Sequence, residues 1–455
     1  MMRNALGALA LGVAVTAVAP LPMRAEPAGQ TAVQSAQAAL VAGNTEMARI
    51  LALAALQDRP DDPDAFAVLA AVALTRHEAK AAGQVALKSW KASESRAQRF
   101  TAARLVARAA YAVDAHEYAK LWLRRAVQNA PDEATRAATI RDFQTVRAAS
   151  PLTFELGLSV TPSDNLNQGV SDPVLVIDGR PTHFTFDGAT MALSGVEASL
   201  SFGARYRLQS SDRGRTDLSF RLRHKAVALS AEAKRLAPAV SASDLATWEL
   251  ETGIQRSLAL SQQSQLRAGI SLGQSWQGGA AYATTTRATL DVTHAFSRST
   301  RIRFGLTAED QNRAAAAKGA VALTMDGGIE HVLASGDRLA LRLELGETQS
   351  SDANQENTRI GSELRYLKAE PVAGARVSAA LGLGYRDYPV FFSGVFGDSG
   401  RQETAISASV DLALPAFGAF GFEPVVTLKG SRTLSNVSRY DTKALGLGVS
   451  LRSSF

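Results

Sequence analysis

The chain contains no cysteine among its 455 residues. Disulfide bonds, thiolate metal sites and cysteine nucleophiles are therefore excluded. Long hydrophobic runs are also missing, because no stretch beyond the first twenty residues approaches the roughly eighteen consecutive apolar residues of a membrane-spanning helix. If this chain lies in a membrane, its strands must close into a barrel, so that every backbone polar group has a partner.

A strong charge of one sign is lacking as well. Lys and Arg together number 49 against 43 Asp and Glu, and the arginines stand singly, with no basic run or interleaved aromatic patch. We therefore expect no nucleic-acid partner. The six histidines show no metal-ligand spacing and no G-x-S-x-G nucleophile elbow is present, so we expect no enzyme activity, no cofactor and no metal.

Residues 1–25 have the pattern of a secretory signal peptide. A short basic start, Met1 to Arg3, precedes an uncharged apolar run at residues 6–18, and Ala25 offers a small residue for cleavage. An N-terminal anchor is the alternative. No cysteine follows the run, so lipid attachment at a lipobox cysteine is excluded.

Residues 26–150 are rich in Ala, Leu, Arg and Glu and predict a periplasmic helical domain. One spacing of two alanines and a proline occurs twice, 71 positions apart, in Ala48, Ala55 and Pro60 and again in Ala119, Ala126 and Pro131. This distance is near twice the tetratricopeptide (TPR) period of about 34 residues. We expect roughly three TPR-like helix pairs, with an ordinary helical bundle as the alternative.

After Ser150-Pro151 the hydrophobic period changes to two, the period of a strand with one apolar and one polar face. Residues 339–346, for example, alternate leucine with Ala, Arg, Glu and Gly. About fourteen such strands of near ten residues predict an antiparallel outer-membrane β-barrel over residues 151–455. A soluble β-sandwich also alternates, but so many arginines and glycines on one face suit a wet lumen better.

Connection lengths support the barrel. Residues 261–264, 297–299 and 335–337 are short polar turns expected on one side, and the longer links 161–190, 231–246 and 389–400 fall on the other. Short periplasmic turns and long outer loops are the pattern of outer-membrane barrels.

The last strand has an apolar face that ends on an aromatic residue. This face is a predicted assembly signal that comprises Leu445, Leu447, Val449, Leu451 and Phe455. It resembles the signal read by the outer-membrane barrel assembly machinery. That machinery and the lipid bilayer are therefore expected partners.

Eight arginines on the polar faces of the strands are candidate lumen residues: Arg205, Arg207, Arg221, Arg223, Arg301, Arg303, Arg342 and Arg376. They would suit anionic segments or solutes. The alternative, which we prefer, is that they pair with lumen acids such as Glu197, Glu344 and Asp411 and stiffen the wall.

The first barrel strand, residues 154–160, runs into the segment 161–168, with Asp164, Asn165 and Asn167 as a candidate first-loop motif. With the helical repeats and the barrel, this segment resembles the surface lipoprotein assembly modulator (Slam) family, the outer-membrane proteins of type XI secretion. Ca²⁺ binding through Asp164, Asn165, Asn167 and Asp172 is possible chemistry, although side-chain bonds to the backbone of a turn are the simpler interpretation.

The resemblance implies transport without covalent chemistry. Its barrel would lie in the cell outer membrane, with the helical domain in the periplasm, and would move lipoproteins or soluble protein clients to the cell surface. An exopolysaccharide exporter that joins TPR repeats to a barrel, and a plain solute porin, are the alternatives.

Overall fold

The computed structural model describes residues 28–314, 319–352, 354–390 and 400–453. The predicted signal peptide at residues 1–25 and the predicted terminal residue of the assembly signal, Phe455, lie outside this part of the chain. The chain divides into two compact units, Met1–Ala115 and His116–Phe455. Each unit is described by itself.

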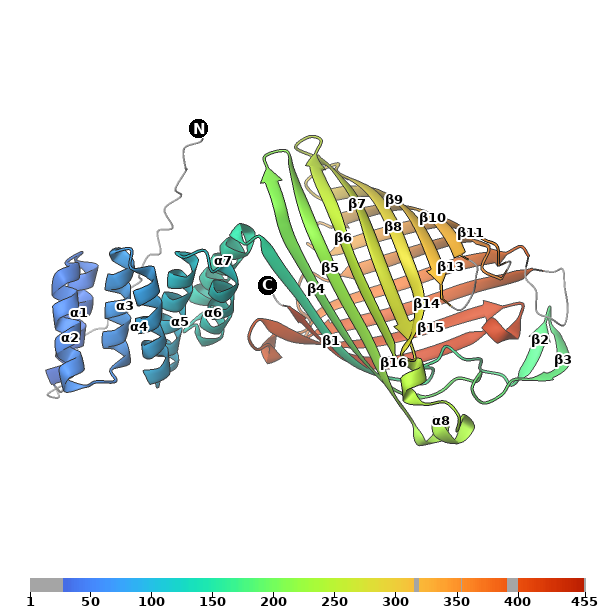
Figure 1. Ribbon diagram of the computed structural model, residues 1–455, viewed down its shortest axis with the longest axis horizontal. Helices are drawn as coiled ribbons and strands as arrows, with labels where there is room; N and C mark the ends of the chain where they lie inside the picture. Colours follow the sequence, from blue (N-terminus) through green and yellow to red (C-terminus); the bar gives the residue numbers. More distant parts are fainter. Residues whose placement is uncertain (1–27, 315–318, 353, 391–399, 454–455) are drawn as a thin grey trace. The chain divides into compact units, whose positions relative to one another are not determined.

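The first unit is built from helices in antiparallel pairs (Figure 1). They are α1 (Ala28–Val41), α2 (Thr45–Asp58), α3 (Pro63–Thr75), α4 (Ala79–Ala92) and α5 (Arg96–Tyr111). Several begin at side-chain caps, because Asp62 accepts from the backbone N–H groups of Asp64 and Ala65, and Ser95 forms a capping box with Gln98.

The second unit starts with two further helices, α6 (His116–Asn129) and α7 (Glu133–Ala149). Helices α1, α3, α5 and α7 begin at residues 28, 63, 96 and 133, so corresponding helices recur every 33 to 37 residues. This is the predicted TPR-like period, and the repeated alanines lie in the helix contacts: Ala48, Ala55, Ala119 and Ala126 are all fully buried. None of the described helices combines the length and the apolarity that a membrane crossing requires.

Fourteen antiparallel strands close into a barrel, as predicted. In chain order they are β1 (Leu152–Ser163), β4 (Gly195–Ser211), β5 (Gly214–Leu229), β6 (Thr247–Ala259), β7 (Ser264–Gln277), β8 (Ala280–Ala295), β9 (Thr300–Arg313), β10 (Gly319–Val332), β11 (Arg338–Ser350), β12 (Asn357–Leu367), β13 (Arg376–Tyr388), β14 (Arg401–Ala413), β15 (Phe422–Ser435) and β16 (Thr442–Ser453). Each strand pairs with its neighbours in sequence, and β1 closes the ring by pairing with both β4 and β16.

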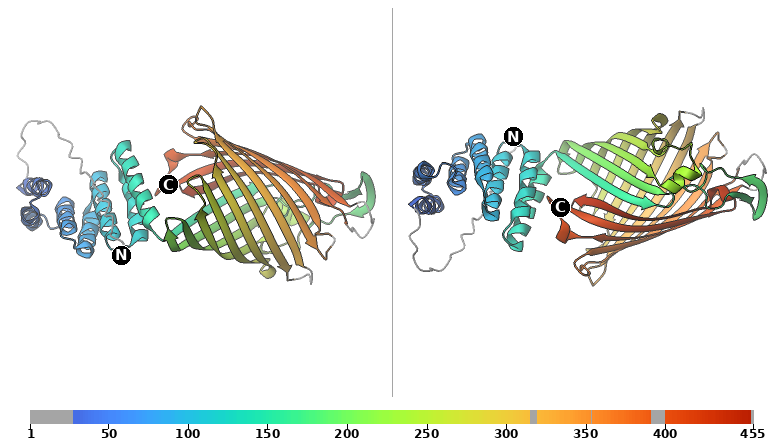
Figure 2. Two further views of the ribbon diagram at one scale, coloured as in Figure 1. Left: turned by 90° about the horizontal axis from the view of Figure 1, so that it is seen from above. Right: turned by 90° about the horizontal axis from the view of Figure 1, so that it is seen from below.

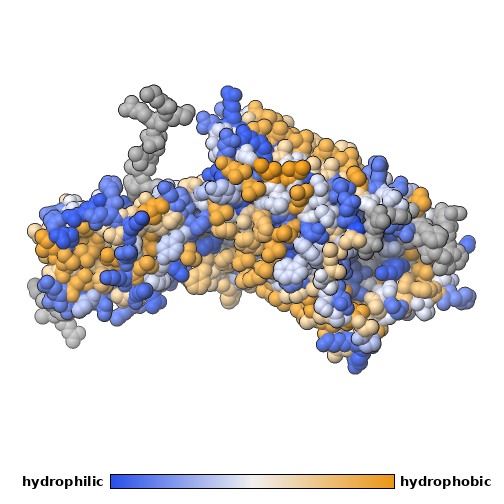
Figure 3. All heavy atoms as spheres, viewed as in Figure 1, coloured by the Kyte–Doolittle hydropathy of each residue, from blue (hydrophilic) through white to orange (hydrophobic). Residues whose placement is uncertain are grey.

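The two faces of the barrel wall differ in polarity. On β11, Leu341, Leu343 and Leu345 are exposed on the outer face, whereas Arg342 and Glu344 lie on the inner one. Figure 3 shows apolar side chains over much of the visible barrel wall. A soluble sandwich would bury such a face in a packed core, so the closed ring with its apolar outer face rules that alternative out.

The rims of the barrel also differ. The rim at which β1 begins, here called the near rim, carries the predicted short turns that join β6 to β7, β8 to β9 and β10 to β11. The opposite far rim carries the predicted long links. One far-rim connection is shorter than the pattern suggests, because Gly278 and Gly279, both at positive φ, turn β7 into β8 in two residues.

The long links at the far rim contain small elements of their own (Figure 2). These are the hairpin of β2 (Val174–Ile177) and β3 (Arg180–Thr185), helix α8 (Ala231–Leu236) and the 3₁₀ turns η1 (Ala242–Leu245) and η3 (Ser438–Tyr440). The hairpin packs on the β15–β16 link through Leu175, Ile177 and Val437. The link between β1 and β4, which contains the hairpin, therefore contacts the link between the last two strands. A further 3₁₀ turn, η2 (Pro415–Phe417), lies at the near rim between β14 and β15.

Candidate functional site: the barrel lumen and its seam

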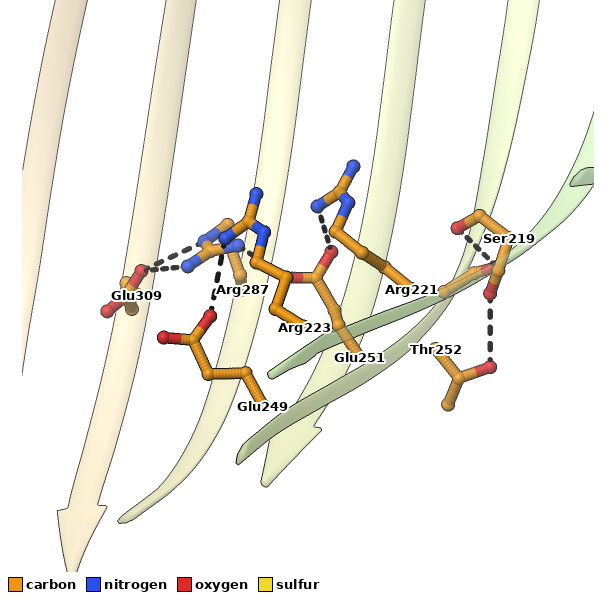
Figure 4. Close-up of polar contacts among 9 residues, drawn as sticks. Ser219, Arg221, Arg223, Glu249, Glu251, Thr252, Arg287 and Glu309 are labelled. Carbon is orange, nitrogen blue, oxygen red and sulfur yellow. Dashed lines mark hydrogen bonds and ion pairs between the residues drawn. The ribbon is translucent and has the colours of Figure 1, made fainter. Parts of the chain in front are cut away.

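A chain of ion pairs joins residues of four strands, β5, β6, β8 and β9, on the inner face of the wall (Figure 4). Arg221 on β5 pairs with Glu251 on β6 at 3.0 Å. Arg287 on β8 bridges Glu251 at 2.7 Å and Glu309 on β9 at 2.8 Å. Because every second residue of a strand faces inward, these charges share the lumen, where they link adjacent strands and, between Glu251 and Arg287, span the intervening strand β7.

A second group of lumen charges centres on Asp326 of β10, which is 8% exposed. Arg303 from β9 and Arg342 from β11 both approach this carboxylate, at 3.8 and 3.5 Å. Glu344 then links Arg342 to Arg359 on β12. The wall from β5 to β12 is therefore held by shared, alternating charges.

Of the eight candidate lumen arginines, five lie in ion pairs: Arg221, Arg223, Arg303, Arg342 and Arg376. Arg207 donates to the carbonyl of Ala148 at 3.1 Å. Arg205 and Arg301 form no ion pair with any acid in the described part of the chain.

The three acids predicted to pair with these arginines differ in the contacts they make. Glu344 pairs with two arginines, whereas Glu197 lies 4.0 Å from Lys225. Asp411 accepts hydrogen bonds from the hydroxyls of Ser378 and Thr427, and no arginine of the described ranges forms an ion pair with it.

Cavities lie against this charged wall. One of about 870 Å³ is lined by Arg267, Arg301, Arg303 and Arg342 together with residues of the β6–β7 turn. Another, of about 580 Å³, is lined by Arg359, Arg386 and the far-rim aromatics Tyr388 and Tyr440. A polar, hollow interior behind an apolar outer face has the polarity that a lipid bilayer demands. This is a transmembrane β-barrel.

The most enclosed charge among the described barrel residues is one that the sequence patterns missed. Glu423 of β15 is 1% exposed and pairs with Arg376 of β13 and with Arg452 of β16, the latter at 3.0 Å. Nothing local marks Glu423, because its partners lie 47 and 29 residues away in the chain.

Arg401 of β14 is a second missed residue. Its side chain is 4% exposed and lies between two rings, 3.4 Å from the centre of Tyr388 and 3.7 Å from that of Tyr440. Its guanidinium also pairs with Glu403 at 3.0 Å. Since Tyr440 belongs to η3, this contact fastens the β15–β16 link to the wall.

The candidate first-loop motif is engaged in side-chain-to-backbone bonds. Asp164 accepts from the N–H of Leu445 at 2.8 Å, and the Asn165 amide donates to the carbonyl of Lys443 at 3.0 Å. Asn167 bridges the backbone of Met191 and Leu193. Asp164 and Asn165 thus connect the first link to β16, which the sequence could not show.

Asp172, the fourth residue considered for Ca²⁺, accepts from the backbone N–H of Val174 at 2.9 Å. The amide nitrogens of Asn165 and Asn167 point at carbonyl oxygens. These side chains therefore stabilise the fold of the link between β1 and β4 by bonding to its own backbone.

The predicted assembly-signal residues Leu445, Leu447, Val449 and Leu451 lie on the outer face of β16 and are 43–56% exposed. This strand forms the seam, defined here as the pairing of β1 with β16. Within the described part of the chain, the seam matches four residues of each strand: Leu158, Ser159, Val160 and Ser163 with Leu451, Ser450, Val449 and Gly446. The shortest of the other barrel pairings, β12 with β13, matches ten.

Helix α6 contacts both strands of the seam at the near rim. The Lys120 ammonium donates to the carbonyl of Leu152 on β1 at 3.0 Å. The Arg124 guanidinium donates to the hydroxyl of Ser453 on β16 at 3.2 Å and to the carbonyl of Gly421 at 3.0 Å. Burial, with a contribution from nearby Arg147, lowers the pKa of Arg124.

No protein-family model and no curated protein matches the chain. Among solved structures, a bacterial polysaccharide outer membrane secretin is 7% identical, with 66% of this chain and 98% of that one covered, at a TM-score of 0.33. A BenF-like porin from Pseudomonas fluorescens Pf-5 is 10% identical over 66% and 98%, at 0.36. The first TPR domain of human RPAP3 is 13% identical over 27% and 93%, at 0.24.

Proposed function

We propose that this protein is an outer-membrane translocator of the Slam type, which moves lipoproteins or soluble protein clients from the periplasm to the cell surface. The observation that carries the proposal is the joining, in one chain, of repeated helix pairs to a closed barrel with a hollow, charged lumen. Stacked helical repeats provide surfaces for peptides and partner proteins, and a lumen lined by charges suits polar cargo.

The proposed orientation follows from the rims. Short turns face the periplasm in outer-membrane barrels, and here most short turns share the near rim with the start of β1. Helices α6 and α7, which directly precede β1, then lie on the periplasmic side. Clients would approach from this side, and the barrel assembly machinery would insert the strands.

The proposed activity of the protein is transport, with no covalent step. The residues that converge in the lumen are paired arginines and carboxylates, whose chemistry is electrostatic guidance of polar cargo. The exopolysaccharide exporter and the solute porin differ from the proposed protein translocator in cargo, so an experiment on cargo separates the three.

The test is a deletion strain compared with the same strain carrying the gene on a plasmid. Intact cells are shaved with protease, the released peptides are identified by mass spectrometry, and periplasmic extracts are measured in parallel. We expect one or a few proteins to leave the surface set and remain in the periplasm. An unchanged surface set together with lost exopolysaccharide, or with lost solute uptake, would replace the proposal by one of its alternatives.

A further inference from the structure

The seam is the weakest join of the barrel wall. Among the described residues it matches four of each strand, whereas all other neighbouring strands of the barrel match ten or more. Pro162 contributes to this, because a proline has no N–H to donate to the opposite strand. Separating β1 from β16 therefore breaks fewer backbone hydrogen bonds than opening the wall anywhere else.

Side chains add little across the seam. Its inner face is made of small residues, among them Gly157 and Ser159 on β1 and Gly448 and Ser450 on β16. A Cβ atom on Gly448 would lie 2.4 Å from the Thr161 hydroxyl, so the strands approach closely only because glycine is there. Within the described residues no ion pair joins β1 to β16, and Arg452 turns instead to Glu423 on β15.

The seam is tied at both ends. At the far rim, Asp164 and Asn165 bond to the backbone of Leu445 and Lys443 on β16. At the near rim, Lys120 and Arg124 of α6 reach β1 and β16 respectively. The Arg124 guanidinium also lies over the rings of Phe143 on α7 and Phe422 on β15, at 4.9 and 5.0 Å. Helix α6 is thus fixed to the two sides of a short join.

A lateral opening would solve a physical problem of the proposed cargo. Moving an acyl chain out of lipid into a polar lumen costs about 0.8 kcal/mol for each CH₂ group. A polypeptide that passes through the lumen beside an open seam leaves its lipid anchor in the bilayer, where that cost does not arise.

We propose that the seam is a lateral exit through which client segments leave the lumen, and that α6 is its latch, with Lys120 and Arg124 holding the near-rim end closed. This inference rests on the proposed translocator function and names the route of the cargo. Displacement of α6 removes the near-rim ties, after which the described contacts that remain across the seam are the short β1–β16 ladder and the Asp164 and Asn165 bonds.

The absence of cysteine allows a direct test. The variant S159C/S450C places two thiols directly opposite each other across the seam. The matched control, S159C/S199C, joins the same residue of β1 to its other neighbour β4, where the two serine hydroxyls lie 2.6 Å apart. Both variants are produced in the deletion strain, oxidised in intact cells and checked for cross-linking by mass spectrometry.

We expect the oxidised seam cross-link to cause loss of newly displayed client, measured by protease shaving, and a reductant to restore it. The β1–β4 cross-link should leave display unchanged. Normal display with the seam fully cross-linked would overturn the lateral exit, and so would equal loss with both cross-links. Neither of these results bears on the translocator function, which the deletion strain tests independently. That function is supported if deletion removes proteins from the surface, and it is contradicted if deletion leaves the surface set unchanged.

The latch has its own readout. K120A/R124Q, introduced with S159C, should label faster with a maleimide in the purified full-length protein than S159C alone. The control R125Q, also introduced with S159C, changes a neighbouring arginine that stacks on Trp122 at 4.3 Å and leaves the two seam contacts in place. Folding of each variant is checked by its heat-modifiable band. Equal labelling rates in folded K120A/R124Q and R125Q would overturn the latch.

Discussion

At the scale of single residues, the buried carboxylate of Glu423 shows how much a lumen charge depends on its partners. Its side chain is 1% exposed, and two arginines from strands on either side neutralise it. A buried charge without its partner costs far more than an exposed one. We therefore expect replacement of Glu423 to destabilise the folded barrel.

Glu423→Gln should lower the temperature at which the folded, heat-modifiable band disappears. The substitution leaves Arg376 and Arg452 without their shared carboxylate, a loss of about 1–3 kcal/mol for a buried hydrogen-bonded charge. The control is Glu363→Gln, since the Glu363–Arg365 pair is exposed on both sides and such pairs contribute about 0–1 kcal/mol. Equal shifts for the two variants would contradict the role given to burial.

Asp337, in the near-rim turn between β10 and β11, predicts a pH dependence. Its carboxylate accepts from the backbone N–H of Ala369 and from the Tyr366 hydroxyl, both at 2.8 Å, and these bonds lower the pKa of Asp337. A depressed carboxylate pKa stabilises the contact above the ordinary Asp value and loses that contribution as the pH falls through the lowered pKa.

Hydrogen exchange of the peptide that contains Ala369, corrected for intrinsic rates, should therefore show protection that declines as the solution becomes more acidic than the ordinary pKa of Asp. Asp337→Asn provides the comparison, because an amide does not titrate in this range. Its protection should be lower at neutral pH and constant on acidification. An identical profile for both proteins would show that the carboxylate does not hold the two turns together.

At the scale of elements, the helices illustrate what local patterns can predict. The repeated alanine spacing predicted TPR-like helix pairs, and Ala48, Ala55, Ala119 and Ala126 are fully buried in the structure. Small residues recur where helices approach closely, so spacing along one chain carries that information. The β2–β3 hairpin and α8 were not predicted, because they are short and pack mainly on other links: the hairpin packs on Val437 of the β15–β16 link, and α8 packs on Leu166 and Leu193 of the β1–β4 link.

Ala55→Leu should destabilise the helical region, since Ala55 is fully buried against Val33 and Ala65 and extra methylenes in a packed core cost about 1–3 kcal/mol. Ala54→Leu is the matched control, one residue away on the exposed face of α2. Thermal melting of the full-length protein, followed by circular dichroism at 222 nm, measures the helices separately from the strands. Similar melting of the two variants would contradict the assigned helix face.

At the scale of the whole molecule, the sequence predicted the order of helices and barrel because period and composition change together near Ser150-Pro151. It also predicted which strand residues share a face. The closing contacts could not be predicted. Asp164 and Leu445 lie 281 residues apart, and Arg124 reaches Gly421 over 297 residues, so no periodicity in one segment identifies either pair.

The polarity of the barrel as a whole can be tested with two adjacent residues of β8. Leu290 is 44% exposed on the outer face, beside Leu306 of β9. Thr289 lies on the inner face opposite Gly269. Both positions have the same depth in the wall, so they differ mainly in what surrounds them.

Leu290→Arg should reduce the folded fraction in isolated membranes, because an arginine that faces lipid near the midplane costs about 2–4 kcal/mol. Thr289→Arg should assemble nearly as well as the parent, since its guanidinium enters the polar lumen beside Asp291. The ratio of heat-modifiable to denatured band in membrane fractions gives the readout. If Thr289→Arg were the more damaging of the two, the assignment of lipid and lumen faces would be reversed, and with it the interpretation of every alternating strand from β1 to β16.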